Sequence, residues 1–101
     1  MLFRSIVDDI VDSAGTLANA ANALKEAGAT SVVAYASHGV LSNGALDRIR
    51  ASALEMLVTT DSILPRQPGE EDRVRRISIA PLLAEAMTRV NTETSVSSLF
   101  D

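Results

Sequence analysis

The sequence predicts an α/β fold, a three-layer arrangement in which a mainly parallel sheet of about four strands has helices on both faces. Short runs rich in Ile and Val alternate along the chain with segments whose apolar residues recur at helical spacing. This alternation is typical of parallel sheets with right-handed crossovers. The length of 101 residues allows one small domain, and a hydrophobic share of 47% is enough for its core.

The first strand and the first helix follow from the start of the chain. Residues 5–11 are rich in Ile and Val and predict a buried strand. Residues 16–27 predict a helix with one apolar stripe, formed by Leu17, Ala20, Ala21 and Leu24. Gly28 is expected to end this helix, because glycine readily adopts the left-handed conformation found after a helix.

The middle of the chain predicts two strands around a short helix. Residues 32–36 are apolar throughout, so this strand is expected to be covered on both faces. Residues 37–44 predict a loop, and a helix is expected from Ala45 with Asn43 as its N-cap. Residues 56–60 predict the third strand.

The last third predicts a loop, a fourth strand and a final helix. Residues 61–72 contain Pro and Gly and end in an acidic run that is expected to be solvated. Residues 74–79 predict the fourth strand, which Arg75 makes partly exposed. Pro81 suits the first position of the final helix. The apolar stripe of that helix is Leu82, Leu83, Ala86, Met87 and Val90.

The stretch from Ile6 to Thr16 joins the first strand to the first helix through small residues. The first N–H groups of a helix have no partner within it, and the helix dipole adds positive charge there, so a phosphate binds well at such a place. Ala14 and Gly15 have no bulky side chain, and Ser13 and Thr16 can donate hydroxyl hydrogen bonds. The sequence therefore predicts an anion cradle, with an ordinary strand–helix turn as the alternative.

Carboxylates accompany the predicted cradle. Asp8 and Asp9 stand just before the turn and Asp12 lies within it. Because carboxylates accept hydrogen bonds, they suit sugar hydroxyls or the water shell of a magnesium ion. His38 and Asp61 follow strands of the same direction, so they are expected at the same rim of the sheet, where such folds bind ligands. The alternative for His38 is a loop residue with local hydrogen bonds, and the alternative for Asp61 is an acid that solvates the loop after a buried strand.

Composition excludes several classes of function. The net charge of −4 argues against a surface that binds nucleic acid. The absence of cysteine excludes a disulfide, a thiolate metal site and a cysteine nucleophile. No apolar run reaches the roughly 18 residues that a membrane span needs. Neither a metal-ligating set nor a catalytic side chain is predicted.

Residues 8–16, with the sequence Asp-Asp-Ile-Val-Asp-Ser-Ala-Gly-Thr, resemble the phosphoribosyl-binding loop of type I phosphoribosyltransferases. This form is most similar to that of ribose-phosphate pyrophosphokinases, the ATP-dependent synthetases of phosphoribosyl pyrophosphate. Later stretches resemble a strand end and loop of that family, and its last helix and C-terminal tail. These stretches are residues 35–42, 80–86 and 95–100.

The resemblance implies a function and a set of site residues. Members of the family transfer a pyrophosphoryl group from ATP to ribose 5-phosphate, require magnesium, and act in the cytoplasm as homo-oligomers. The residues implied for the 5-phosphate are Asp12, Ser13, Ala14, Gly15 and Thr16, and those implied for the ribose hydroxyls are Asp8 and Asp9. The residues implied for a phosphate-sensing effector site are Ser95, Val96, Ser97 and Phe100.

The resemblance also predicts that residues 1–101 are a single C-terminal fragment of a phosphoribosyltransferase-like domain, with 1–5 as an unrelated start and 94–101 as the C-terminal tail. The family's basic catalytic loop and most of its ATP site lie upstream of the motif, so the fragment is expected to be inactive alone. Two alternatives remain. One is another type I phosphoribosyltransferase, whose loop more often ends in Thr-Gly-Gly or Thr-Gly-Thr. The other is a non-catalytic regulatory homologue, which tends to lose the loop pattern.

Overall fold

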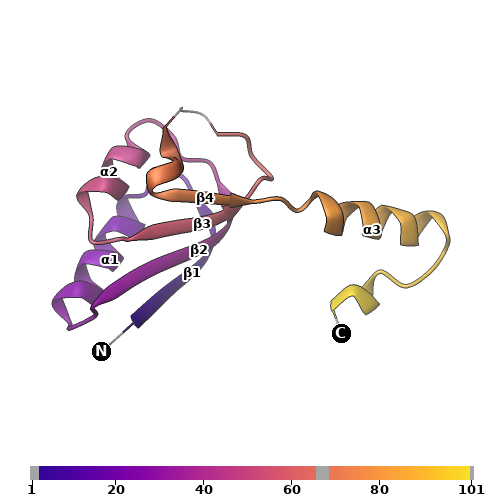
Figure 1. The fold of residues 1–101 in the computed structure, drawn as a ribbon, viewed down its shortest axis with the longest axis horizontal. Helices are drawn as coiled ribbons and strands as arrows, with labels where there is room; N and C mark the ends of the chain where they lie inside the picture. Colours follow the sequence, from indigo (N-terminus) through magenta and orange to yellow (C-terminus); the bar gives the residue numbers. More distant parts are fainter. Residues whose placement is uncertain (1–2, 66–68, 101) are drawn as a thin grey trace.

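The protein forms a four-stranded sheet with the strand order β1-β2-β3-β4 (Figure 1), seen in a computed structural model that describes residues 3–65 and 69–100. All three strand pairs are parallel. The strands are β1 (Phe3–Val11), β2 (Ser31–Gly39), β3 (Met56–Thr60) and β4 (Val74–Ile77). The helices are α1 (Gly15–Glu26), α2 (Ala45–Ala51) and α3 (Ala80–Asn91), with short 3-10 turns η1 (Glu70–Asp72) and η2 (Ser97–Phe100). The predicted α/β class with a parallel sheet is therefore confirmed.

Most element boundaries agree with the prediction, and the exceptions have local causes. β3 matches its predicted range, whereas β2 extends to Gly39 because β1 continues to pair with it, Ile10 with His38. The first part of the predicted loop 37–44 is therefore strand. The predicted N-cap is wrong: Gly44, with a φ of 84°, precedes α2, and no side chain caps that helix.

One face of the sheet is covered by α1 and α2. α1 contacts β1, β2 and α2 (Figure 1), and the buried side chains of both helices join those of the strands in one apolar cluster. The row Ala34–Leu57–Val74 crosses the two pairings of β3, with β2 and with β4, on this face, and all three side chains are buried. Because β1 to β4 follow each other in one direction across the sheet, right-handed crossovers place both helices on the same side.

The opposite face of the sheet is open, which corrects the prediction of helices on both faces. The register row on this face runs Val7–Tyr35–Val58–Arg75. Val7 is 79% exposed and Tyr35 43% exposed, so neither β1 nor β2 is buried as predicted. β1 also lies at an edge of the sheet.

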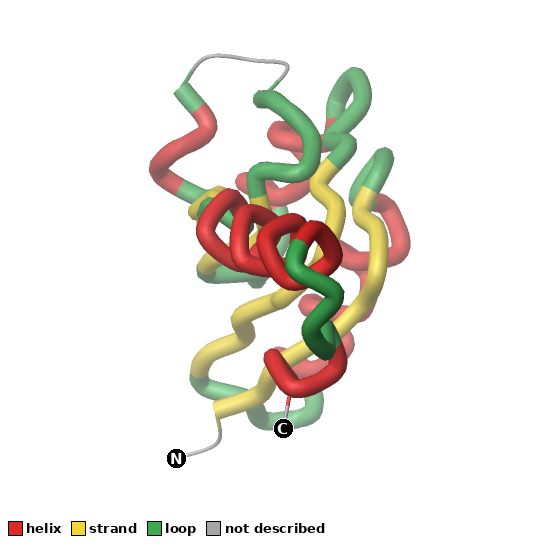
Figure 2. The backbone as a smooth tube through the Cα atoms, turned by 90° about the vertical axis from the view of Figure 1, so that its right-hand side faces the viewer, coloured by secondary structure: helices red, strands yellow, loops and turns green. Residues whose placement is uncertain are grey.

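The final helix projects beyond the sheet instead of forming a second helical layer. α3 stands away from the sheet (Figure 1). None of its residues is buried, so its apolar stripe is exposed. Figure 2, viewed from the side toward which α3 projects, shows this helix in front of the strands. The Cα radius of gyration is 16.1 Å, against about 13 Å for a compact domain of this length. Within the described ranges, no helix is both long and apolar enough to cross a membrane.

A buried ion pair holds the end of the sheet together. Glu70, predicted to be solvated, is buried and receives hydrogen bonds from Arg76 on β4, with Nε 2.9 Å from Oε2. The same guanidinium donates to the backbone oxygens of Gly39 and Ile63 at 3.2 and 2.9 Å. Arg76 therefore joins β2, β4, η1 and the loop after β3.

Candidate phosphate-binding site

The turn between β1 and α1 has an unusual backbone conformation. β1 ends at Val11, and α1 begins at Gly15 after a left-handed residue, Ala14, with a φ of 66°. An L-residue pays about 1 kcal/mol for this conformation. Ala14 is also buried and belongs to the apolar core. Its side chain therefore lies on the core side of the turn. Alternation of right- and left-handed residues turns successive N–H groups toward one side, as in anion-binding nests.

Three successive carbonyl groups of this turn are tied to the next strand–helix connection. The Val11 oxygen accepts from the N–H groups of Val40 and Leu41 at 2.9 and 3.2 Å, and the Asp12 oxygen accepts from Ser42 N–H at 3.0 Å. The Ser13 oxygen accepts from Arg48 Nη1 at 2.9 Å. In a trans peptide the C=O and the following N–H point in opposite directions. The N–H groups of residues 12, 13 and 14 therefore point away from residues 40–48.

A cavity of about 240 Å³ lies at this turn. Its lining residues are Asp8, Ile10, Val11, Asp12, Ser13, Ala14, Gly15, Thr16 and Leu17. The first turn of α1 contributes N–H groups that have no acceptor within the helix, and no acidic residue lies in that turn to compete with an anion. The cavity therefore combines backbone donors with the positive end of a helix dipole, which suits a phosphate.

Gly15 leaves space that the fold does not need. A Cβ at this position would meet only Ser13 Oγ, at 3.9 Å. Gly15 does not require a positive φ, unlike Gly44, so an alanine would fit the backbone. Glycine in a helix lowers stability relative to alanine. Packing does not require a glycine at this position, because a Cβ would have space. The glycine therefore leaves the backbone of the cavity open to solvent.

The cavity also contains hydroxyl and carboxylate groups. The side chains of Ser13 and Thr16 are exposed, and neither hydroxyl caps α1, so both are free to donate to a ligand. Asp8 and Asp12 line the cavity, whereas Asp9 does not. The Asp9 N–H donates to Asp8 Oδ1 at 2.8 Å. Within residues 3–65 and 69–100, no group of three or more His, Cys, Asp or Glu could hold a metal ion.

Comparison with known proteins shows the family of the chain. A family model described as "Phosphoribosyl synthetase-associated domain" matches residues 3–101. The chain belongs to this family.

This phosphoribosyl synthetase-associated domain is similar to parts of longer proteins. It is 60% identical over 97 residues to a ribose-phosphate pyrophosphokinase of Mesorhizobium japonicum, with coverage of 95% of this chain and 31% of the relative. A ribose-phosphate pyrophosphokinase of Listeria ivanovii is 52% identical over 96 residues, covering 95% of this chain and 30% of the relative. The phosphoribosylpyrophosphate synthetase of Mycobacterium smegmatis matches with a TM-score of 0.83 and 34% identity, over 90% of this chain and 30% of that one. The chain thus spans less than a third of the length of these proteins.

The two further residues expected at the rim of the phosphoribosyl synthetase-associated domain take part in local hydrogen bonds. His38 Nδ1 lies 2.7 Å from Ser62 Oγ. Asp61 Oδ1 accepts from Ile79 N–H at 2.9 Å, and this bond, with a further one from the Ser78 hydroxyl, lowers the pKa of Asp61. Neither residue lines the cavity at the turn. Asp61 instead fixes the start of α3 to the end of β3.

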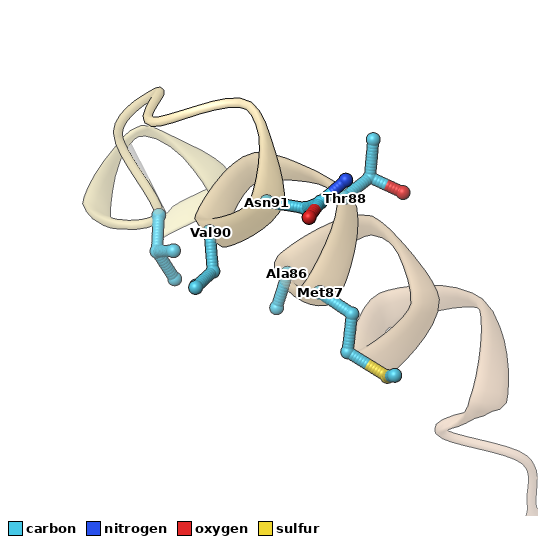
Figure 3. A pocket seen from close by; sticks show the side chains of 6 residues that line it. Ala86, Met87, Thr88, Val90 and Asn91 are labelled. Atoms are coloured by element: carbon cyan, nitrogen blue, oxygen red, sulfur yellow. The ribbon is translucent and has the colours of Figure 1, made fainter.

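The residues suggested for an effector site lie in the tail, far from the cradle in sequence. Val96 lines a groove of about 680 Å³ along α3, together with the side chains labelled in Figure 3. The hydroxyls of Ser95 and Ser97 lie 2.8 Å apart, and Phe100 is 72% exposed. The tail is held by Arg89 of α3, whose Nη1 donates to the Ser95 oxygen at 3.1 Å and to the Ser98 hydroxyl.

Sequence reasoning missed two arginines that hold these segments. Arg48 donates to the turn at Ser13, 35 residues earlier in the chain, and Arg89 holds the tail. No local pattern identifies either contact, because each depends on a backbone oxygen that only the folded chain brings into reach. The i,i+4 spacing of Glu85 and Arg89 indicates only that these two side chains pair with each other, and Arg89 Nε lies 3.0 Å from Glu85 Oε1.

Proposed function

We propose that the chain is the ribose 5-phosphate-binding part of a ribose-phosphate pyrophosphokinase. The observation that carries the proposal is the turn after β1, where three anchored carbonyl groups direct successive N–H groups away from α2 at an open helix start. The names of the relatives favour this function over another phosphoribosyltransferase or a regulatory homologue. The complete enzyme would transfer pyrophosphate from ATP to ribose 5-phosphate and release AMP.

The proposed roles follow from the chemistry of each group. The 5-phosphate is bound by N–H groups from Asp12 to Thr16 and by the hydroxyls of Ser13 and Thr16. Asp12 contributes its N–H, since its carboxylate would repel a phosphate. Asp8 lines the same cavity and accepts hydrogen bonds from the ribose hydroxyls. Asp9 lies outside the lining, so its contribution is secondary.

The remaining expectations belong to the complete enzyme. Magnesium usually binds to proteins through one or two carboxylates together with substrate oxygens and waters. Asp8, which lines the cavity, would supply such a carboxylate beside a bound sugar phosphate. ATP, a homo-oligomeric assembly and a cytoplasmic location follow from the resemblance. Assignment to the C-terminal part of the domain stays a prediction from the resemblance alone, and β1 has a free edge at which further strands of the complete enzyme could pair. Ser95, Val96, Ser97 and Phe100 are proposed as effector-site residues on the resemblance alone.

Calorimetric titration of the chain tests the binding role. Ribose 5-phosphate should bind, inorganic phosphate should compete with it, and unphosphorylated ribose should bind far more weakly, because the phosphate makes the backbone contacts. Gly15→Val should abolish binding while the far-ultraviolet circular dichroism spectrum stays unchanged, since a Cβ at this position would meet only Ser13 Oγ, at 3.9 Å. Equal binding of ribose 5-phosphate to both proteins would remove this turn from the site.

A second assay tests the division of labour between this chain and the rest of the enzyme. With ATP, magnesium and ribose 5-phosphate supplied, the chain alone should release no AMP, because groups outside it position ATP against the sugar. Turnover comparable to that of a complete synthetase would contradict the proposal that this chain only binds the sugar phosphate.

A further inference from the structure

Among the described residues, Arg48 provides the one side-chain hydrogen bond to the anchored carbonyl groups of the turn. The Val11 and Asp12 oxygens accept from backbone N–H groups, whereas the Ser13 oxygen accepts from the guanidinium of Arg48 at 2.9 Å. Arg48 lies in α2, so this bond joins the helix after β2 to the turn after β1. The Ser13–Ala14 peptide, close to the start of α1, is therefore oriented by a side chain.

Gly44 leaves the space that the Arg48 guanidinium occupies. A Cβ on Gly44 would lie 3.2 Å from Arg48 Nη1 and 3.5 Å from Cζ, so the guanidinium lies directly against the backbone at this glycine. Gly44 has a φ of 84°, in the region that glycine adopts without strain. The same nitrogen, Arg48 Nη1, thus lies against Gly44 and donates to the Ser13 carbonyl, on a side chain that is otherwise exposed.

Orientation of this peptide decides where the Ala14 N–H points. The Ser13 oxygen points toward Arg48, so the N–H of the same trans peptide points away from α2. Ala14 stays in the left-handed conformation, which is costly without such support. If the bond to Arg48 is lost, this peptide can rotate and withdraw a donor from the cradle.

We propose that Arg48 is a positioning residue of the phosphate cradle, which holds the Ser13–Ala14 peptide in the orientation that binds a phosphoryl group. The proposal rests on the proposed function. A second contribution is electrostatic: among the salt bridges of the described residues none includes Arg48, whereas Arg50 on the same helix pairs with Asp72 at 2.9 Å. The positive charge of Arg48 remains available to attract an anion, with the usual screening by salt.

The test compares Arg48→Met, Arg48→Lys and a matched control, Arg50→Met, in the 101-residue chain. Amide ¹H–¹⁵N spectra of the ligand-free proteins report the Ser13–Ala14 peptide directly, and calorimetry gives the Kd for ribose 5-phosphate. Arg48→Met should shift the amide signals of Ala14 and Gly15 and weaken binding about tenfold, the loss expected for one charge-assisted hydrogen bond. Arg48→Lys should recover part of the affinity at low salt, because it keeps the charge but not the planar donor geometry.

The control separates positioning from general destabilisation. Arg50→Met removes a cation from the same helix and breaks its pair with Asp72, yet it should leave the Ala14 signal and the Kd within twofold of the wild type. Unshifted Ala14 and Gly15 signals in both Arg48 variants would overturn the proposal, whatever the affinity. Failure of the wild type to bind ribose 5-phosphate would refute the proposed function, while the ligand-free spectra still decide the role of Arg48. If Arg48→Met does not fold, the spectra and Kd of Arg48→Lys decide.

Discussion

Replacement of Gly15 by alanine should stabilise the protein and weaken its binding site at the same time. The added Cβ would meet only Ser13 Oγ, at 3.9 Å, and the backbone at Gly15 does not require a positive φ. Alanine in a compatible position restricts the unfolded chain and favours the helix, worth about 0.5 kcal/mol. For a domain of this size, that corresponds to an increase in Tm of about 2–4 °C.

The same methyl group occupies the space through which a phosphate would reach the backbone. Loss of one hydrogen bond to a charged phosphate oxygen costs about 1.5–3 kcal/mol, which weakens the affinity by a factor of ten or more. Differential scanning calorimetry gives the Tm, and isothermal titration gives the Kd for ribose 5-phosphate. A natural glycine that lowers stability while permitting binding is the signature of a functional constraint.

Gly28 provides the matched control for the Gly15 substitution. Gly28 ends α1 with a φ of 107°, where alanine is strained by roughly 1–2 kcal/mol, so Gly28→Ala should lower the Tm and leave the Kd unchanged. An unchanged Kd for Gly15→Ala would refute the reasoning, because it would show that the ligand does not approach this part of the backbone. A lower Tm for Gly15→Ala would show that the glycine has a structural role that the packing does not reveal.

Three further predictions concern other parts of the fold. Glu70→Gln should lower the free energy of unfolding by about 3 kcal/mol, because it leaves the buried Arg76 guanidinium without its counter-charge. Urea titration measures this change, and an unfolding midpoint equal to that of the wild type would show that the pair is solvated. Asp61 has a lowered pKa through its bond to Ile79 N–H, so its contribution to stability is present above a pH of roughly 4 and is lost as the pH falls through the folded-state pKa. Asp61→Asn should reduce this pH dependence of thermal unfolding between pH 2 and 5, roughly the range around an ordinary Asp pKa, and an identical pH profile would contradict the assignment. Truncation after Glu93 should leave the Kd for ribose 5-phosphate within twofold, since no tail residue lines the cavity at the turn, and a larger loss would connect the tail to the sugar site.

The elements of the sheet could be predicted because each has a local cause. Residues 56–60 are a short run that ends in three β-branched residues, Val58 to Thr60, and β3 has this range. The stripe that includes Leu17 and Ala21 is buried on α1, and Pro81 lies in the first turn of α3. A periodic pattern of apolar residues, however, does not show which other element, if any, covers them. Val7 and the stripe of α3 are exposed here, although both have the pattern of buried residues.

The candidate site could be predicted only in part. Small residues before a helix indicated a cradle, and the cavity is lined by the turn from Asp12 to Thr16. The left-handed conformation of Ala14 and the contact of Arg48 with Ser13 could not be predicted, because they arise from tertiary hydrogen bonds across 35 residues. Glu70 was misjudged for the same reason, since its partner Arg76 comes from β4.

The most direct test of the central claim is an amide chemical-shift titration of the isotopically labelled chain with ribose 5-phosphate. If the backbone of the turn binds the phosphate, the largest shifts should occur at the N–H groups of residues 12–17, with smaller ones at Asp8 and little change in α3 or the tail. Inorganic phosphate should reproduce the shifts at residues 12–17 but not that at Asp8. Shifts concentrated on the open face of the sheet or along α3, with the turn unaffected, would contradict the account.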